Sequence, residues 1–372
     1  MTRCLEDCGV EVEGAVSQFY QGVASGGIEQ RFRYGGQGDY ELSFDCGRIC
    51  DLDRWTLELG AEHRFADTVN LATGSVIPVA VAPSLPSPTT NHLALTKARF
   101  AYELHDNVEA FFGKIDALEE NSNAFADGNG TERFFGSSFN FYTIAVRTVP
   151  FSTLAAGLHV MRDKERAFTL AVLNTADTAT TVGISDLFAN GAVIFTELRL
   201  PITVCGYRGH QAVGGSWSSA TFTSLSQDGR VNCPDIPIAT KSGSWALFWS
   251  ADQYLWQDPC DGRRGWGLFA EAGISDGNPN PIEWTLSFGV GGNSPFRGRI
   301  DDRFGIGWYY VGISNEFSVL ANLIDDGEGV ELFYDIAMSE TFRFAVNLQI
   351  VDPTLTGADT AVVPGFRGRI EF

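Results

Sequence analysis

The sequence lacks the features of several common protein classes. It contains no run of 18 or more consecutive apolar residues, which excludes a membrane-spanning helix. Charged residues make up only 19% of the chain, whereas glycine occurs 41 times and aromatic residues reach 12%. This composition is poor in the residues of charged amphipathic helices and favours turns and strands. It therefore predicts an all-β protein.

Basic residues are also scarce. The chain has 26 Lys and Arg residues against 46 Asp and Glu residues, which gives a formal net charge of -20. Nucleic acid is excluded as a partner, because phosphate backbones are bound by a surplus of positive charge. The first residues, MTRCLEDCGVEVEG, lack the basic and apolar regions of a secretory signal. If the protein is exported, we expect its signal peptide to be absent from this chain.

Histidine is rare and does not occur in catalytic or metal-binding motifs. The five histidines lack an H-x-E, H-E-x-x-H or nucleophile-elbow context, so neither a zinc hydrolase nor a Ser-His pair is indicated. An outer-membrane phospholipase would need a lipid-side Ser and His, and no convincing pair is present. We expect no enzyme, no metal and no cofactor. The histidines are His63, His92, His105, His159 and His210.

Cysteine occurs seven times, an odd number, in two C-x-x-x-C pairs and three loop-like contexts. A four-thiolate zinc site is disfavoured, because structural zinc sites prefer C-x-x-C spacing. Disulfides in an oxidising compartment are the favoured interpretation, with the pairing undetermined, and free thiols remain the alternative. The candidate disulfide residues are Cys4, Cys8, Cys46, Cys50, Cys205, Cys233 and Cys260.

Alternation of apolar and polar residues is the strongest pattern in the chain. In residues 342–350, FRFAVNLQI, every even-numbered residue is apolar and every odd-numbered residue is polar or small. Residues 330–337 repeat the pattern, and residues 338–340 are a connection short enough for a hairpin. Other segments alternate similarly, including residues 55–62 and FNFYTIAVRTV. We count about sixteen segments of about ten residues, as in a transmembrane β-barrel.

A large soluble sandwich or barrel would also show alternating strands. Its polar side chains would point outward and its interior would be filled by Val, Ile and Leu. Here the polar face carries bulky Arg, Glu, Asp and Gln, which a water-filled lumen accommodates without the cost of desolvation. Aromatic residues also gather at segment ends, as expected of an interfacial girdle; examples are Phe134, Phe135, Phe139, Phe141, Tyr142, Trp245, Phe248, Trp249, Trp308, Tyr309 and Tyr310.

The predicted fold is therefore an all-β, transmembrane antiparallel β-barrel of about sixteen strands, in which residues 1–372 form a single domain. Short turns are expected on the periplasmic side. Three longer segments, which begin near residues 68, 116 and 226, are expected to face outward or to fold toward the lumen as constrictions.

The last third of the chain resembles the carbohydrate-selective porin (OprB) family. The similarity is carried by RGRIDDRFGIGWYYVGIS and by GVELFYDIAMSETFRFAVNLQIVDPTLTGADTAVVPGFRGRIEF, and FFGKID at 111–116 is similar to the G-K-x-D segment of that family. The resemblance implies a monomeric barrel in the outer membrane of a Gram-negative-type bacterium. Such a barrel contacts outer-membrane lipid and passes sugars and other small hydrophilic solutes by diffusion. The terminal Phe372 resembles the signal read by barrel-assembly machinery.

Residues that share the polar face of the strands are candidates for lining the pore. Arginine can donate two hydrogen bonds to sugar hydroxyls and carboxylates can accept from them. The alternative role is a ladder of salt bridges that stiffens the wall. We predict that the pore-lining residues, with Lys114 and Asp116 facing Arg99 and Glu103 across a hairpin, are Arg99, Glu103, Lys114, Asp116, Arg303, Glu331, Asp335, Arg343, Arg367, Arg369 and Glu371.

Two alternatives to a sugar porin remain open at this point. One is a general diffusion pore that prefers cations, in keeping with the net charge of -20. The other is a soluble carbohydrate-binding β-protein, which would need no detergent and would bury its apolar residues. A pore, by contrast, predicts single-channel conductance and heat-modifiable migration on gels.

Overall fold

The computed structural model describes residues 2–85, 93–117, 123–227, 235–262, 264–317 and 323–372. Within these described residues, seventeen strands form one sheet, and β2 has only three residues, so sixteen long strands make up the wall. The strands are β1 (Val10–Gly22), β2 (Ser25–Gly27), β3 (Phe32–Asp45), β4 (Trp55–Ala66), β5 (Ala94–His105), β6 (Val108–Asp116), β7 (Ser152–Arg162), β8 (Glu165–Asn174), β9 (Ala192–Val204), β10 (Tyr207–Thr223), β11 (Thr240–Gln257), β12 (Gly265–Ser275), β13 (Ile282–Asn293), β14 (Arg303–Ile313), β15 (Gly327–Ala337), β16 (Phe342–Asp352) and β17 (Asp359–Glu371).

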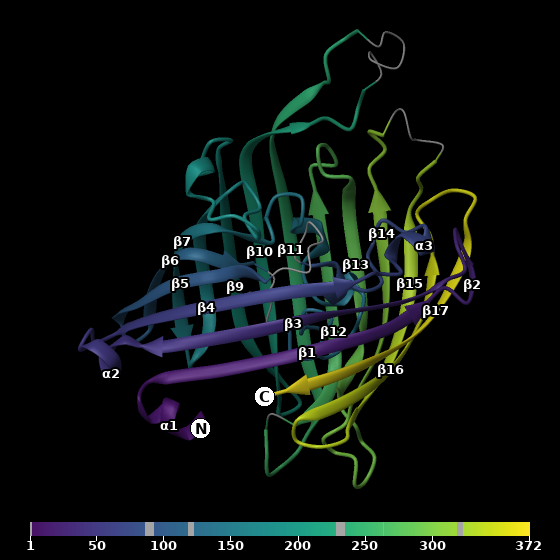
Figure 1. Ribbon diagram of the computed structural model, residues 1–372. Helices are drawn as coiled ribbons and strands as arrows, with labels where there is room; N and C mark the ends of the chain where they lie inside the picture. The colour runs from purple at the N-terminus through teal and green to yellow at the C-terminus, as the bar shows by residue number, and fades with distance from the viewer. Residues whose placement is uncertain (1, 86–92, 118–122, 228–234, 263, 318–322) are drawn as a thin grey trace.

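The sheet closes on itself. Each long strand pairs antiparallel with its neighbours in the chain, and β17 pairs with β1, which in turn pairs with β3. Closure leaves the sheet without an open edge, as a bilayer requires. The two termini lie at the same end of the barrel (Figure 1). The predicted sixteen-stranded antiparallel barrel is thereby confirmed.

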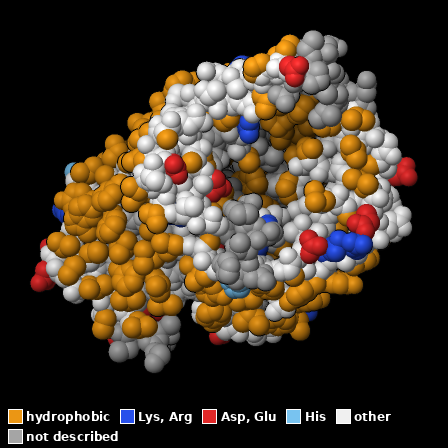
Figure 2. Space-filling view, turned by 45° about the horizontal axis from the view of Figure 1, so that its top comes forward, with side chains coloured by type: hydrophobic (Ala, Val, Ile, Leu, Met, Phe, Trp, Pro, Cys, Tyr) orange, Lys and Arg blue, Asp and Glu red, His pale blue; other side chains and the backbone are white. Residues whose placement is uncertain are grey.

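The two faces of each strand differ as the alternation predicts. In β16 the outward-facing Val346, Leu348 and Ile350 are 43%, 38% and 43% exposed, whereas Asn347 and Gln349 are each 2% exposed. Hydrophobic side chains spread over the outer surface, and an opening leads into the interior (Figure 2). Apolar side chains therefore point away from the barrel axis. In the described part of the chain, no helix is long and apolar enough to cross a membrane.

The two ends of the barrel carry different connections. At the end with the termini, the connections are short turns such as 106–107, 163–164 and 205–206, and the small helices α1 (Thr2–Asp7) and α2 (Cys46–Cys50) lie there too. At the other end the connections are longer and include α3 (Asn70–Thr73) and the 3-10 turns η1 (Ala82–Ser84), η2 (Ser137–Phe139), η3 (Thr143–Ala145) and η4 (Ile184–Asp186). Short turns face the periplasm in this class of barrel, so the longer loops face outward.

The connection between β6 and β7 packs against the inner wall. Its residues 123–149, which we name the inner loop, are largely buried and form hydrogen bonds with inward-facing side chains of β15 and β17. The segment FNFYTIAVRTV lies in this loop and forms η2 and η3, so its prediction as a strand is wrong. Its alternation serves packing inside the barrel.

Glycines on the inner wall accommodate the inner loop. A Cβ atom at Gly305 would lie 2.7 Å from the ring of Phe134, and one at Gly307 would lie 2.5 Å from the ring of Phe139. Phe134 contacts the rings of Phe139 and Phe333 with centroids 4.4 and 4.8 Å apart. Since wall and loop interlock here, Phe134 and Phe139 belong to a core and not to the interfacial girdle predicted for them. The girdle prediction is wrong for Phe248 and Tyr309 too, because both are buried in the same core.

Cysteine chemistry differs from the prediction. The described thiols of Cys8, Cys46, Cys50, Cys205 and Cys260 are all free, so the expectation of disulfides is wrong for these five. Cys46 and Cys50 are four residues apart on α2, where Cβ atoms are about 5–6 Å apart, too far for the roughly 3.5–4.5 Å of a disulfide. Cys233 and the side chain of Cys4 lie outside the described residues.

Candidate functional site: the lumen

One side of the inner wall is covered by the inner loop. The carboxylate of Glu331 on β15 accepts hydrogen bonds from the backbone N–H groups of Phe135 and Gly136 and from Asn347 on β16. The neighbouring Gln349 donates from Nε2 to the carbonyl of Val79, at 2.7 Å, and so holds the connection between β4 and β5 as well. These inward polar groups therefore hold loops to the wall.

A buried ion pair reinforces the same contact. Arg367 on β17 donates from Nη2 to Asp335 at 2.8 Å and from Nη1 to the carbonyls of Gly130 and Arg133, both at 3.0 Å. Arg343 adds a second hydrogen bond to Asp335, from Nε at 2.6 Å. The side chains of Arg367 and Asp335 are 0% and 1% exposed, so neither touches a solute while the inner loop is in place.

Glu132 ties the inner loop to the wall near the periplasmic end. Its carboxylate lies 2.9 Å from Nη1 of Arg303 on β14 and 3.5 Å from Nη2 of Arg369 on β17. Burial alone would raise the pKa of Glu132, but the guanidinium groups of Arg303 and Arg369 outweigh it and hold that pKa below its ordinary value. The carboxylate is thus favoured in its charged form.

The opposite side, formed by β3 to β6, carries a ladder of ion pairs. Lys97 on β5 lies 2.7 Å from Glu41 on β3. Arg99 donates to both oxygens of Glu58 on β4 at 2.9 Å and also pairs with Glu109 on β6. We name these five residues the open wall, because their three carboxylates keep part of their surface exposed.

The basic and acidic side chains of the open wall differ in how much of their surface is exposed. The side chains of Arg99 and Lys97 are only 5% and 11% exposed, whereas those of Glu109, Glu58 and Glu41 are 28%, 30% and 39% exposed. The cations lie beneath and the carboxylates project toward the lumen. Arg99 also lies over the ring of Phe111, with its guanidinium carbon 4.9 Å from the ring centroid, which fixes its position. The charge accessible to a solute is therefore negative.

A cavity of about 510 Å³ joins the open wall to the inner loop at the periplasmic end. We name it the acidic vestibule. It contains one basic side chain, that of Arg369, among six acidic ones, which are Glu13, Asp39, Glu41, Glu132, Glu340 and Glu371. Strand register explains the cluster, because Glu13 pairs with Glu41 and Ala15 with both Asp39 and Glu371.

The structure separates the predicted pore residues into groups. Arg99 belongs to the open wall, Arg303 on β14 pairs with Glu132 of the inner loop, and Arg369 and Glu371 line the acidic vestibule. Glu103 is exposed and pairs in register with Glu109, near the β5–β6 turn. Asp116 is buried at the end of β6, beside Glu62. Glu331, Asp335, Arg343 and Arg367 belong to the covered side or its edge.

The prediction that Lys114 faces Arg99 is wrong. In the β5–β6 register Arg99 pairs with Gly113, and Lys114 pairs with Ala98 on the opposite face. Gly113 and Lys114 are successive residues of a pleated strand, so only one of them can share the face of Arg99. Lys114 therefore points outward, where it donates to the backbone of another loop.

Several lumen residues were not predicted. Glu58 and Glu62 lie on the polar side of the alternating segment 55–62. The alternation that assigned Glu331 to the inward face would therefore have assigned these two residues to it as well. On the β8–β11 side, His210 lies 3.0 Å from both Asp252 and Glu165. This cluster joins three strands, and the sequence gives no local signal for it.

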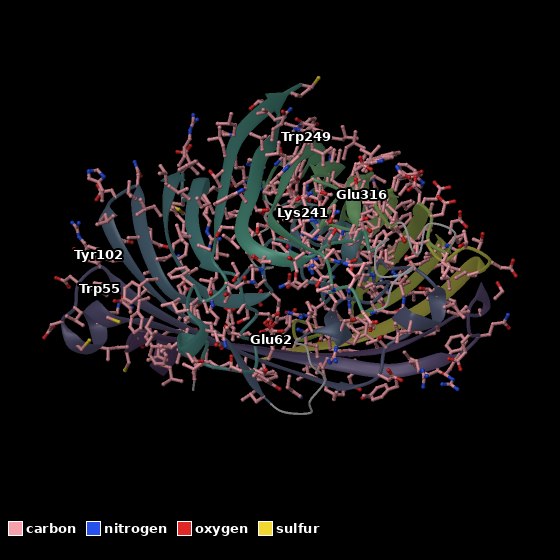
Figure 3. All side chains as sticks on the ribbon, turned by 90° about the horizontal axis from the view of Figure 1, so that it is seen from above. Trp55, Glu62, Tyr102, Lys241, Trp249 and Glu316 are labelled. Atoms are coloured by element: carbon pink, nitrogen blue, oxygen red, sulfur yellow. The ribbon has the colours of Figure 1, made fainter. Side chains whose placement is uncertain are left out.

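Glu62 of β4 lies on the lumen side of the wall, whereas Trp55 and Tyr102 lie at the outer edge, as the view along the barrel shows (Figure 3). The rings of Trp55 and Tyr102 are 4.7 Å apart. Alternate residues of one strand thus serve the lumen and the membrane interface.

Solved structures of similar shape are outer-membrane barrels. The high-pH structure of Pseudomonas putida OprB matches with a TM-score of 0.84 at 18% identity, covering 100% of this chain and 96% of that one. The low-pH structure of the same protein matches with a TM-score of 0.62 at 15% identity, covering 100% and 95%. A loop deletion mutant of OmpT from Vibrio cholerae matches with a TM-score of 0.55 at 12% identity, covering 98% and 99%. These likenesses establish the fold.

A comparison with curated protein sequences gives no match. The family model described as "Carbohydrate-selective porin, OprB family" matches residues 29–372, which is most of the chain. That match agrees with the closed barrel, the apolar outer face and the charged lumen. The chain therefore belongs to the carbohydrate-selective porin (OprB) family and is a porin of the Gram-negative outer membrane, through which carbohydrates and other small hydrophilic solutes diffuse.

Proposed function

We propose that sugars and cations cross the barrel along the open wall and through the acidic vestibule. The observation that carries this proposal is the difference in exposure: the accessible groups of the open wall are carboxylates, and the cations that hold them are buried. Carboxylates accept hydrogen bonds from sugar hydroxyls, and fixed cations beneath them restrict their orientation. The residues proposed to contact solutes are Glu41, Glu58, Glu109, Glu132, Arg303 and Glu371.

Conductance in planar bilayers with a panel of sugars tests the path. We expect ion current through single channels, reduced reversibly by a neutral hexose or oligosaccharide that occupies the lumen. The Glu58→Gln, Glu109→Gln double variant should weaken this block, because amides accept from hydroxyls less strongly than carboxylates. Current without any block by sugars would instead indicate a general diffusion pore.

The acidic vestibule should make the pore prefer cations. At low salt we expect a reversal potential that favours cations, and the preference should fall as ionic strength screens the vestibule. The Glu13→Gln, Glu41→Gln double variant removes two of its six carboxylates and should lower the preference further. The Glu29→Gln variant is the control, because Glu29 pairs with Arg31 in the β2–β3 connection at the other end of the barrel. An unchanged or anion-favouring potential in the vestibule variant would contradict the assignment.

The chain is further proposed to act as a monomeric channel without catalytic activity. Phe372 supports a role as a signal for barrel-assembly machinery, because its side chain is 66% exposed while its backbone completes the pairing with Gly14. Removal of the Phe372 side chain by Phe372→Ala should therefore lower the amount of barrel in the outer membrane more than the stability of the folded barrel.

A further inference from the structure

The outer wall carries a groove of about 570 Å³, which lies within the roughly 300–1,000 Å³ range of ligand sites. Its floor is the lipid-facing side of β5, β6 and β7, and its other side is the β8–β9 loop, residues 175–191. The lining is mostly apolar and includes Leu95, Ala98, Phe100, Phe112, Val182 and Ile184. The loop belongs to the outward end of the barrel, so the groove faces the outer leaflet.

Lys114 holds the loop over the wall. Its register partners Ala98 and Leu154 show that it points outward, and yet it is only 6% exposed. Its Nζ donates to the carbonyl of Thr178 at 2.6 Å and to that of Thr181 at 2.9 Å. An ammonium group has three N–H donors. Among the described residues only these two acceptors are recorded, so one donor remains for a ligand in the groove.

The loop residues beside the groove are apolar and exposed. Val182 and Ile184 are 72% and 67% exposed, although they lie on a loop at the outward end of the barrel. Exposed apolar side chains of this size on a loop favour contact with hydrocarbon over contact with water. The groove is also continuous with the lipid-facing surface of the barrel, where Leu95, Phe100 and Phe112 are exposed. Both observations favour a lipid chain as the occupant.

We propose that this groove binds an acyl chain of a lipid of the outer leaflet, the lipid A portion of lipopolysaccharide, with Lys114 donating to an oxygen at the head of the chain. The floor and the loop enclose the chain. The ammonium group favours lipid A, whose phosphates make its head anionic, over phosphatidylethanolamine, whose head is zwitterionic. Lipid bound there would also hold the β8–β9 loop against the barrel.

Native mass spectrometry of the folded barrel in detergent tests the site, with lipid A and phosphatidylethanolamine added separately at equal concentration. We expect one lipid A adduct on the wild-type barrel and a much weaker phosphatidylethanolamine adduct. The Ala98→Phe variant fills the groove and should weaken the lipid A adduct about tenfold, the equivalent of about 1.4 kcal/mol. Lys114→Met should weaken it less, because the apolar contacts remain.

The matched control is Ala270→Phe. Ala270 lies on the outward face of β12, opposite Ala251 and Phe288 and away from the groove, so the same change of side chain should leave the adduct intact. Heat-modifiable migration checks that each variant is folded. Equal adducts on the Ala98→Phe and Ala270→Phe variants would overturn the proposed groove. An equal or stronger phosphatidylethanolamine adduct on the wild type would overturn the preference for lipid A.

Discussion

The covered side and the open side of the lumen are built from the same strand pattern and serve different purposes. On β15 to β17 the inward Glu331, Asp335 and Arg367 are each 1% exposed. Glu331 and Arg367 hydrogen-bond to the inner loop, and Asp335 pairs with Arg367. On β4 and β6 the inward Glu58 and Glu109 keep about a third of their surface exposed, at 30% and 28%. An inward polar residue thus anchors a loop where the loop buries it. Where no loop buries it, the same kind of residue lines the channel.

The difference shows how such a pore is narrowed. Phenylalanines of the inner loop pack against wall glycines, and buried carboxylate and guanidinium groups satisfy the backbone of the loop. Because buried polar groups need partners, each anchor specifies one position of the loop. The carboxylates of the open wall, by contrast, remain partly exposed to the lumen.

Disrupting the contact between glycine and phenylalanine should produce the largest effect. Gly307→Leu places a side chain where a Cβ atom alone would lie 2.5 Å from the ring of Phe139. The inner loop should leave the wall, and single-channel conductance should rise several-fold. Gly262→Leu is the control, because a Cβ atom there has no neighbour within 4 Å. A folded Gly307→Leu barrel with unchanged conductance would show that the inner loop does not narrow the pore.

Removing the charge of Arg367 should produce the next largest effect. Arg367→Met leaves the carboxylate of Asp335 with one partner and two loop carbonyls without theirs. Breaking a buried ion pair from one side costs about 3–5 kcal/mol, so the barrel should unfold at lower denaturant concentration. Arg162→Met, at a site 64% exposed, should change the free energy of unfolding by no more than about 0.5 kcal/mol. Similar losses in both variants would argue against Arg367 as an anchor.

The smallest effect concerns pH. The folded-state pKa of Glu132 lies below its ordinary value of 4.5, so its contribution to stability is complete above that value and is lost as pH falls through the folded pKa. The free energy of unfolding of the wild type should exceed that of Glu132→Gln at neutral pH, and the gap should close in acid. The gap is small because the Glu132 side chain is 34% exposed. A gap that widened in acid would reverse the assigned direction.

The sequence predicted the wall better than the lumen. Alternation in residues 342–350 placed Arg343, Asn347 and Gln349 on the inward face, and their register bears this out. The same reasoning failed at Lys114, because the GK pair could be assigned to either face until the pairing of Gly113 with Arg99 was known. One residue of shift exchanges the two faces of a strand.

The inner loop was the feature least accessible to sequence. Phe134 and Phe139 looked like girdle aromatics, although they pack inside the barrel. One signal was present: the G-x-G pairs at 265–267, 305–307 and 327–329 lie within strands, where glycine is otherwise disfavoured and indicates a close neighbour. The residues around each glycine in the sequence, however, do not indicate which side chain packs against it.

Period-two alternation by itself determined that this chain is built of strands with one apolar and one polar face, because the face of each side chain follows from its position in its own strand. Only the tertiary structure decided which inward residues are dry anchors and which contact the lumen. Glu331 meets Phe135 across 196 positions of the chain, and Arg367 meets Gly130 across 237. Contacts so distant leave no trace in a local pattern, because they depend on how the whole barrel closes around the loop.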